Sequence, residues 1–245
     1  MVERVRADES VVGLVLTGSR GHDAFVQPGS DWDVRLIVRD EDVAEAEDRY
    51  RTVRGSAVEV AVLSLAALER VGEIGSRESW DRYSYVHVET GIDKLDGRIA
   101  RLVADMQHLR PEAAARALAA EALDAYINSY LRSLKNARAG LVVEAHLDAA
   151  ESIPSLLTAL FAMHERVRPF NRFLGWELEH YPLTGDAWAA GALLPRLESV
   201  MGDGDVAGQA SLFREMERLA RANALGEVVD SWQPDLDWLR TGGKA

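Results

Sequence analysis

Two short apolar runs that enclose a polar, acid-bearing segment constrain the fold of this chain most strongly. Residues 11–16 lead into Gly18-Ser19, and the segment Ser30-Asp31-Trp32-Asp33 opens the second run at residues 34–38. Because side chains alternate along a strand, Asp31 and Asp33 are expected to project to the same side. Two adjacent carboxylates repel each other unless a cation lies between them. Mg²⁺ is commonly held by one or two carboxylates together with substrate phosphates. The pair therefore predicts a metal-nucleotide site.

The spacing of these residues resembles the signature of the nucleotidyltransferase superfamily, whose fold is similar to the palm of DNA polymerase beta. The shared features are Gly-Ser, a spacer (here residues 20–29), and Ser-Asp-x-Asp at the start of a strand. The resemblance implies a third carboxylate on a neighbouring strand. Glu59 is the candidate, since it is the single acid in the β-branched run 57–62 and a charge there is costly to bury unless paired or metal-bound. Asp31, Asp33 and Glu59 are thus the expected metal ligands and catalytic residues.

The role of Glu59 is left open between two chemistries. It could be the third metal ligand, or the base that removes a proton from the acceptor hydroxyl, as the aminoglycoside-modifying branch of the superfamily implies. Structural alternatives also exist for the acids. Ser-Asp is a common turn pair, and Glu59 could be an exposed acid on an edge strand.

A second group of candidates concerns the nucleotide. In the superfamily the Gly-Ser turn lies against the triphosphate, which makes Gly18 and Ser19 the matching positions; a glycine lets phosphate oxygens approach the backbone. The segments SLKNARAG (133–140) and AHLDAAESIPSLLTALFAMHERVRPFN (145–171) resemble the helical half of streptomycin/spectinomycin-type adenylyltransferases. That resemblance implies a lysine reaching the triphosphate, and Lys135 is the candidate. The structural alternative is a cation at a helix end, stabilised by the helix dipole.

The expected fold class is an α/β (α+β) N-terminal nucleotidyltransferase domain with a mixed sheet, residues 1–108, followed by an all-α helical bundle, residues 109–245. A helix over 40–54 is expected to connect neighbouring strands at 33–38 and 57–63, and Ser64 to cap a helix over 65–72. Residues 83–88 alternate as in a strand, and 91–97 are typical of a turn. Beyond Pro111, apolar residues recur at three- and four-residue intervals, as in helices.

Composition narrows the function classes. The chain has 245 residues, no cysteine and a net charge of −12. The absence of cysteine excludes disulfides and thiolate metal sites, and together with the lack of an apolar leader or membrane-length run it favours a cytoplasmic protein. The acidic balance argues against a long nucleic acid as partner and favours small cationic substrates. No histidine pair has the spacing of a metal site.

Two further features have competing explanations. Glu144, Asp148 and Glu151 fall at helical spacing and form one acidic stripe, which is either a solvated helix face or a seat for an ammonium-bearing substrate. Arg35 is expected on the same strand face as Asp33, where it either pairs with an acid or tempers the affinity for metal.

Taken together, the sequence predicts an Mg²⁺-dependent nucleotidyltransferase with ATP as co-substrate. It is expected to transfer AMP to a hydroxyl of a small, cationic acceptor such as an aminoglycoside, a chemistry associated with antibiotic resistance. The alternative is an inactive or antitoxin-like member of the fold that acts as a nucleotide- or protein-binding module. The sequence leaves the oligomeric state open.

Overall fold

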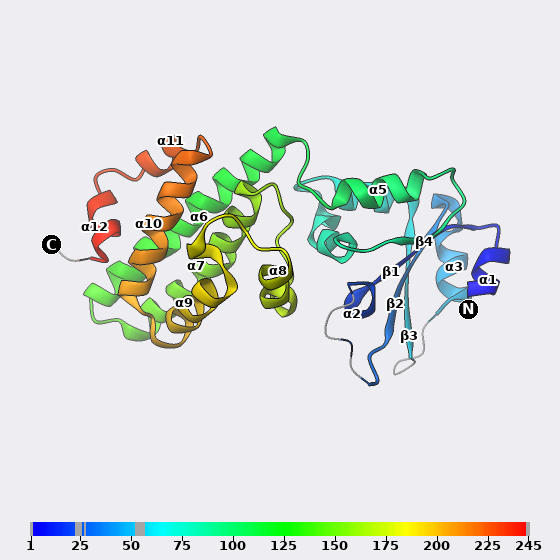
Figure 1. The fold of residues 1–245 in the computed structure, drawn as a ribbon, viewed down its shortest axis with the longest axis horizontal. Coiled ribbons are helices and arrows are strands. Elements are labelled where there is room, and N and C mark those ends of the chain that lie inside the picture. Colours follow the sequence, from blue (N-terminus) through cyan, green and yellow to red (C-terminus); the bar gives the residue numbers. More distant parts are fainter. Residues whose placement is uncertain (1, 23–25, 27, 52–56, 244–245) are drawn as a thin grey trace. The chain divides into compact units, whose positions relative to one another are not determined.

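A four-stranded mixed sheet with the strand order β3-β2-β1-β4 organises the first part of the chain (Figure 1). The computed structural model describes residues 2–22, 26, 28–51 and 57–243. β1 (Val11–Thr17) pairs antiparallel with both β2 (Trp32–Val38) and β4 (Thr90–Asp93), whereas β2 pairs parallel with β3 (Val58–Ser64). The prediction that the second and third strands lie side by side is therefore confirmed.

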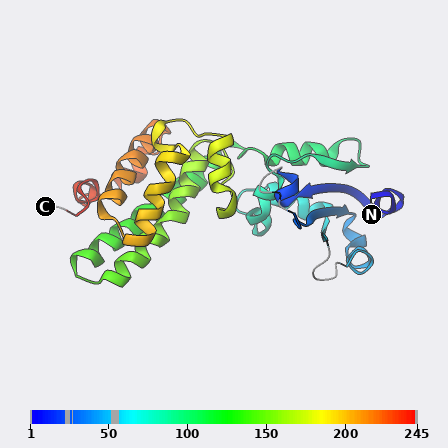
Figure 2. The ribbon, with the colours of Figure 1, turned by 60° about the horizontal axis from the view of Figure 1, so that its bottom comes forward.

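The chain divides into two units, residues 1–110 and 111–245. In the first unit, helices cover both faces of the sheet (Figures 1 and 2). On one face, α1 (Val2–Ala7) and α3 (Val43–Arg49) pack on a core that includes Leu36 and Val38. On the other, α4 (Leu65–Gly72) and α5 (Arg98–Met106) pack on a core that includes Val15 and Ile37. Side chains of β2 alternate between the two faces of the sheet. In the first half of the strand, the odd-numbered residues Asp33 and Arg35 belong to neither core and face a polar site.

Local sequence accounts for several element boundaries. The Ser64 hydroxyl accepts a hydrogen bond from the backbone N–H of Ala67 at 3.0 Å, which confirms the expected cap of α4. The expected helix over 40–54 is shorter: a 3₁₀ turn η1 (Asp40–Asp42) precedes α3. Residues 52–56, where that helix was expected to stop, lie outside the described residues, as do four positions of the 20–29 spacer and the last two residues of the chain.

The expected strand over residues 83–88 is wrong. A 3₁₀ helix, η2 (Arg77–Tyr85), occupies this region, and the strand comes later as β4, where the sequence predicts a turn. Ser76 caps η2 by accepting a hydrogen bond from the N–H of Ser79 at 3.1 Å. The aromatic alternation arises because Tyr83 and Tyr85 are both buried from this helix, so burial rather than strand geometry produced the pattern.

Arg82 fixes η2 against the ends of two helices. Its Nη1 donates to the Gly72 carbonyl at the end of α4 at 2.7 Å, and its Nε donates to the Met106 carbonyl at the end of α5 at 3.1 Å. Nη2 donates to the carbonyl of His108 at 2.5 Å. The carbonyls at a helix C-terminus lack partners within the helix and carry partial negative charge. A buried guanidinium thereby satisfies them and joins three elements.

The second unit is all helical, as predicted. Its two long helices, α6 (Glu112–Arg138) and α7 (Val142–Met163), form an antiparallel hairpin, and α7 continues through Pro154. The other elements are the helices α8 (Leu174–His180), α9 (Ala190–Asp203), α10 (Val206–Ala222), α11 (Gly226–Asp230) and α12 (Leu236–Thr241), with 3₁₀ turns η3 (Asn171–Phe173) and η4 (Asp186–Trp188). The predicted class, a mixed α/β unit followed by a helical one, is confirmed. No described helix combines the length and apolarity that crossing a membrane requires.

Candidate metal and nucleotide site

The three predicted acids converge at one end of the sheet. Asp33 and Glu59 are register partners across the parallel β2–β3 pair, and Asp31 immediately precedes β2. Each of the three residues offers a carboxylate oxygen, and these oxygens all lie within 4.8 Å of one another. Asp31 and Asp33 are half-buried, and Glu59 is exposed. The parallel register explains the convergence, because partners in adjacent strands place their side chains on the same face.

No cation from the described part of the chain offsets the charge of Asp31 or Glu59, neither of which forms an ion pair there. Carboxylates this close repel each other, and an arrangement of three oxygen ligands matches what hard divalent cations such as Mg²⁺ take. The donor set therefore fits a magnesium ion with sites left for water and phosphate oxygens.

Gly18 lies directly against this cluster. It begins the short turn α2 (Gly18–Gly21) after β1, and its backbone adopts a φ of +67°. A β-carbon added there would lie 1.9 Å from Oδ2 of Asp33. Both the left-handed conformation and the close approach require glycine. Ser19 follows as a half-buried residue of the same turn, so the structure brings the predicted Gly-Ser pair next to the acids.

Four contacts hold the turn and the start of β2 in place, and none of them is predicted from the sequence. The Arg20 guanidinium donates to the Ser30 carbonyl from Nε at 3.0 Å and from Nη2 at 2.9 Å, and it stacks over the Trp32 ring at 4.5 Å. The buried His22 ring contacts the Gly18 carbonyl through Nδ1 at 2.7 Å. It also stacks on Tyr83 of η2, with ring centroids 5.2 Å apart. In the sequence, the only indication of a role for Arg20 and His22 is that they lie close to the Gly18-Ser19 motif.

Arg35 pairs with an acid, which was one of its two expected roles. It follows Asp33 on the same face of β2, and its Nη2 lies 3.4 Å from Oδ2 of Asp81 in η2. The Ser84 hydroxyl donates to the other oxygen, Oδ1 of Asp81, at 2.6 Å. The pair forms a polar layer between the acidic cluster and the apolar core that begins at Ile37. Sequence analysis could not identify Asp81, because its proximity depends on the 3₁₀ helix that was not predicted.

Lys135 lies in the second unit, in the last turns of α6. Its side chain is exposed and makes no hydrogen bond or ion pair with any described residue. The ammonium group is therefore available to an anionic ligand.

The acidic stripe on α7 is engaged by side chains of α6 instead of being an open seat for a cation. Arg132 Nε donates to Asp148 Oδ1 at 2.9 Å, and the same guanidinium pairs with Glu151. Asn136 Nδ2 donates to the second Asp148 oxygen at 2.7 Å. Asp148 is buried, so the stripe serves mainly to join the two helices of the hairpin, and Glu144 alone among its members lacks a partner within the described chain.

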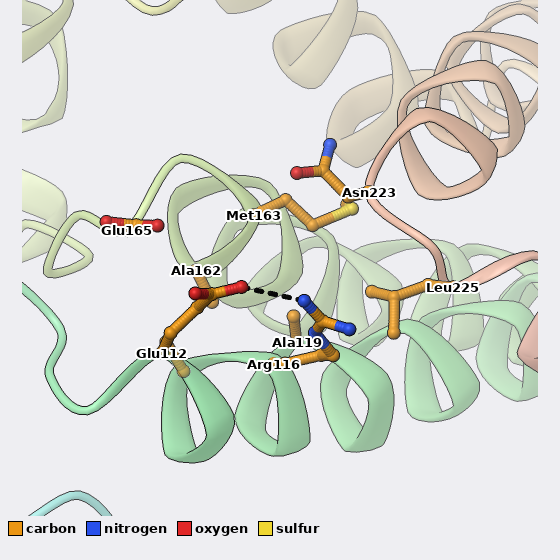
Figure 3. A pocket seen from close by; sticks show the side chains of 9 residues that line it. Glu112, Arg116, Ala119, Ala162, Met163, Glu165, Asn223 and Leu225 are labelled. Atoms are coloured by element: carbon orange, nitrogen blue, oxygen red, sulfur yellow. Dashed lines mark hydrogen bonds and ion pairs between the residues drawn. The ribbon is translucent and has the colours of Figure 1, made fainter.

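A small pocket lies within the second unit, and none of the predicted site residues lines it (Figure 3). Its volume is about 60 Å³, and Glu112 pairs with Arg116 at its edge, with N and O atoms 2.7 Å apart. Met163 and Leu225 supply apolar walls. The pocket has room for little more than a water molecule or a small ion.

Comparison with solved structures finds a likeness to the crystal structure of a nucleotidyltransferase-like protein from Exiguobacterium sibiricum. The match has a TM-score of 0.50 at 12% sequence identity, and it covers 95% of this chain and 78% of the other. No protein-family model matches the sequence, and no curated protein matches it. At this level of identity the likeness concerns the fold, which is nucleotidyltransferase-like across the α/β unit and the helical unit.

Proposed function

We propose that the chain is a magnesium-dependent nucleotidyltransferase that transfers AMP from ATP to a hydroxyl group of a small acceptor. The observation that supports this most directly is the convergence of Asp31, Asp33 and Glu59 within 4.8 Å, against the Gly18 turn. The nucleotidyltransferase-like fold supports the same reaction class.

In this proposal each residue has a stated task. Asp31 and Asp33 would hold Mg²⁺, with Glu59 as third ligand or as the base that accepts the acceptor's proton. Magnesium, when bound, would neutralise charge on the attacked phosphate and on the leaving pyrophosphate. The backbone at Gly18 and the Ser19 hydroxyl would bind the triphosphate, and Lys135 would add a cation to it.

The chemical step is an in-line displacement at the α-phosphorus. The acceptor oxygen forms a new P–O bond, the bond to the β-phosphate oxygen breaks, and pyrophosphate leaves. The hydroxyl proton passes to Glu59 or to solvent. The close approach of Gly18 to Asp33 and the register pairing of Asp33 with Glu59 support a site whose acids are arranged before substrate binds.

The acceptor is proposed to be a cationic, hydroxyl-rich small molecule such as an aminoglycoside. The net charge of −12 supports this, because an acidic protein attracts cationic substrates and steers them by long-range electrostatics. Engagement of the α7 acidic stripe by Arg132 and Asn136 removes that stripe as the main recognition surface, so recognition would fall to other acids.

The test is incubation with ATP, Mg²⁺ and a panel of aminocyclitol antibiotics, with pyrophosphate release and acceptor mass as readouts. We expect an acceptor that gains one adenylyl group, and a loss of at least about 1,000-fold in rate with Asp31→Asn or Asp33→Asn. Asp96→Asn is the matched control, because Asp96 is exposed and its carboxylate forms no hydrogen bond or ion pair with a described residue. Undiminished turnover in Asp33→Asn would refute the proposal. ATP binding without turnover on any acceptor would favour a nucleotide-binding module.

A further inference from the structure

One end of the helical unit gathers an unusual share of exposed apolar side chains. Ten large hydrophobic residues are exposed among those described, and five of them lie at or beside the turn between α6 and α7. We call this set the hairpin-end patch; it consists of Leu141, Val142, Val143, Leu147 and Met201, which are 46%, 60%, 68%, 65% and 53% exposed. Contiguous apolar surface of this kind marks interaction sites more often than scattered exposed residues do.

Met201 comes from a different helix, but it lies at the same end of the unit as the other members of the patch. The first four residues span the α6–α7 turn and the first turns of α7. α7 also packs against α9, and the His146 ring lies so close to Gly204 that a β-carbon there would be 2.3 Å from it. Met201 is one turn before Gly204. Figure 1 accordingly shows the α6–α7 turn and the α9–α10 turn at the same end of the unit.

The patch rests on a rigid support. Behind it, the Ser133 hydroxyl donates to the Ala145 carbonyl at 2.9 Å, and Asp148 accepts hydrogen bonds from Arg132 and Asn136. These buried contacts fix the first turns of α7 against α6. Val143 and Leu147, four residues apart on one helix, are therefore held outward and cannot turn inward to escape water.

Opposite charges lie close to the patch in the sequence, with Arg138 three residues before Leu141 and Asp203 two residues after Met201. Arg138, in the last turn of α6, and Asp203, at the end of α9, are both exposed, and neither side chain has a partner in the described part of the chain. α7 contacts both helices and carries the apolar residues between them. A two-fold axis through the patch would place each Arg138 opposite the Asp203 of a second copy. An isologous contact needs such self-complementarity, and a patch with both signs matches it.

We infer that the hairpin-end patch is the contact surface of a two-fold homodimer. Leu147 and Val143 pack against the same residues of the partner copy, and Arg138 pairs across the contact with Asp203. A membrane surface is a poorer match, because interfacial helices carry a strongly cationic polar face whereas this chain has a net charge of −12. The inference is independent of the proposed reaction, and Lys135 lies almost one turn further from the hairpin end than Arg138.

The test is sedimentation equilibrium of the full chain over a range of concentrations. We expect reversible dimerisation, and a dissociation constant raised by at least about 100-fold in Leu147→Asp, which buries a charge in the contact. Val2→Asp is the matched control, since Val2 is 48% exposed but lies in α1, and it should dimerise as the wild type does. A chain that stays monomeric, or a dimer that Leu147→Asp leaves unchanged, would overturn the inference.

The charge pair provides a second, independent arm. Arg138→Glu places like charges opposite each other and should weaken dimerisation about tenfold, and so should Asp203→Arg. The double variant restores opposite charges and should recover most of the wild-type affinity. All of these positions are exposed, so folding is retained, which circular dichroism checks. Failure of the double variant to recover would overturn the proposed pairing of Arg138 with Asp203.

Discussion

Gly18 and Asp33 are in such close contact that no other residue type fits at position 18. A β-carbon there would lie 1.9 Å from the Asp33 carboxylate, and the backbone φ of +67° independently disfavours any side chain. The turn that is proposed to bind the triphosphate and the strand that carries the acids therefore determine each other's position. A change on one side of this contact must be transmitted to the other.

The first prediction concerns this contact. Gly18→Ala should displace the Asp33 carboxylate and lower nucleotidyl transfer by about 100-fold, because a small misplacement of a reacting group has effects of that size. Gly75→Ala is the matched control: its φ of +86° imposes similar strain, but nothing lies within 4 Å of the added carbon. The positive φ alone should cost each variant about 1 kcal/mol of stability, and the clash with Asp33 should cost Gly18→Ala more. Equal rates for the two variants would show that the contact has no catalytic importance.

Arg82 should be essential for the stability of the first unit. Arg82→Met leaves the buried carbonyls of Gly72, Met106 and His108 without their donor, at an expected loss of about 3 kcal/mol in the free energy of unfolding. Denaturant unfolding measures it. Arg101→Met is the control, because Arg101 is exposed and donates to one carbonyl only, that of Asp96. A loss below that of the control would mean that water replaces the guanidinium without cost.

Much of the first unit follows from the sequence, and the remainder has identifiable physical reasons. Strand periodicity predicted that Asp31 and Asp33 would project to the same side, and the resemblance to the nucleotidyltransferase superfamily implied Glu59 as their neighbour. By contrast, no strand forms at 83–88, because η2 runs to Tyr85 and buries Tyr83 and Tyr85 from a 3₁₀ helix held by Arg82. Arg82 makes its hydrogen bonds with residues 10 to 26 positions away in the sequence, which no local pattern reports.

The ion pairs that stabilise the site and the helical hairpin were likewise not predictable from local sequence. Arg35 was recognised as unusual, yet its partner Asp81 lies 46 positions away. Arg132 lies near Lys135 at the same helix end, and it forms ion pairs with Asp148 and Glu151 on the next helix, which a helix-dipole explanation does not predict. The spacing of charged residues along one helix predicts the face on which an acid lies. It does not predict which residues of a neighbouring helix pack against that face.

A third prediction concerns pH. The hydrogen bond from Arg240, with a further one from Arg221, holds the pKa of the Glu217 carboxyl below its ordinary value. The folded state therefore binds the proton more weakly than the unfolded chain, so this pair contributes stability above the unfolded pKa and loses it as the pH falls through the folded pKa. Between about pH 5 and pH 3, the stability of the wild type should fall more steeply than that of Glu217→Gln. Parallel pH profiles in thermal unfolding would contradict this account.

Glu59→Gln separates the two roles of that residue. If Glu59 is a metal ligand, the substitution should weaken Mg²⁺-dependent nucleotide binding together with turnover. If it is the base, turnover should fall by about 100-fold or more while binding is kept. Parallel measurement of nucleotide affinity and of pyrophosphate release distinguishes the two, and unchanged values for both would remove Glu59 from the site.

The proposed function requires the acidic cluster to bind nucleotide through magnesium, and calorimetric titration with a non-hydrolysable ATP analogue measures this binding. We expect the wild type to bind the analogue at least about tenfold more tightly with Mg²⁺ than with a chelator, and Asp33→Asn to abolish this difference. Equal affinity with and without Mg²⁺, or a magnesium effect that survives Asp33→Asn, would contradict it.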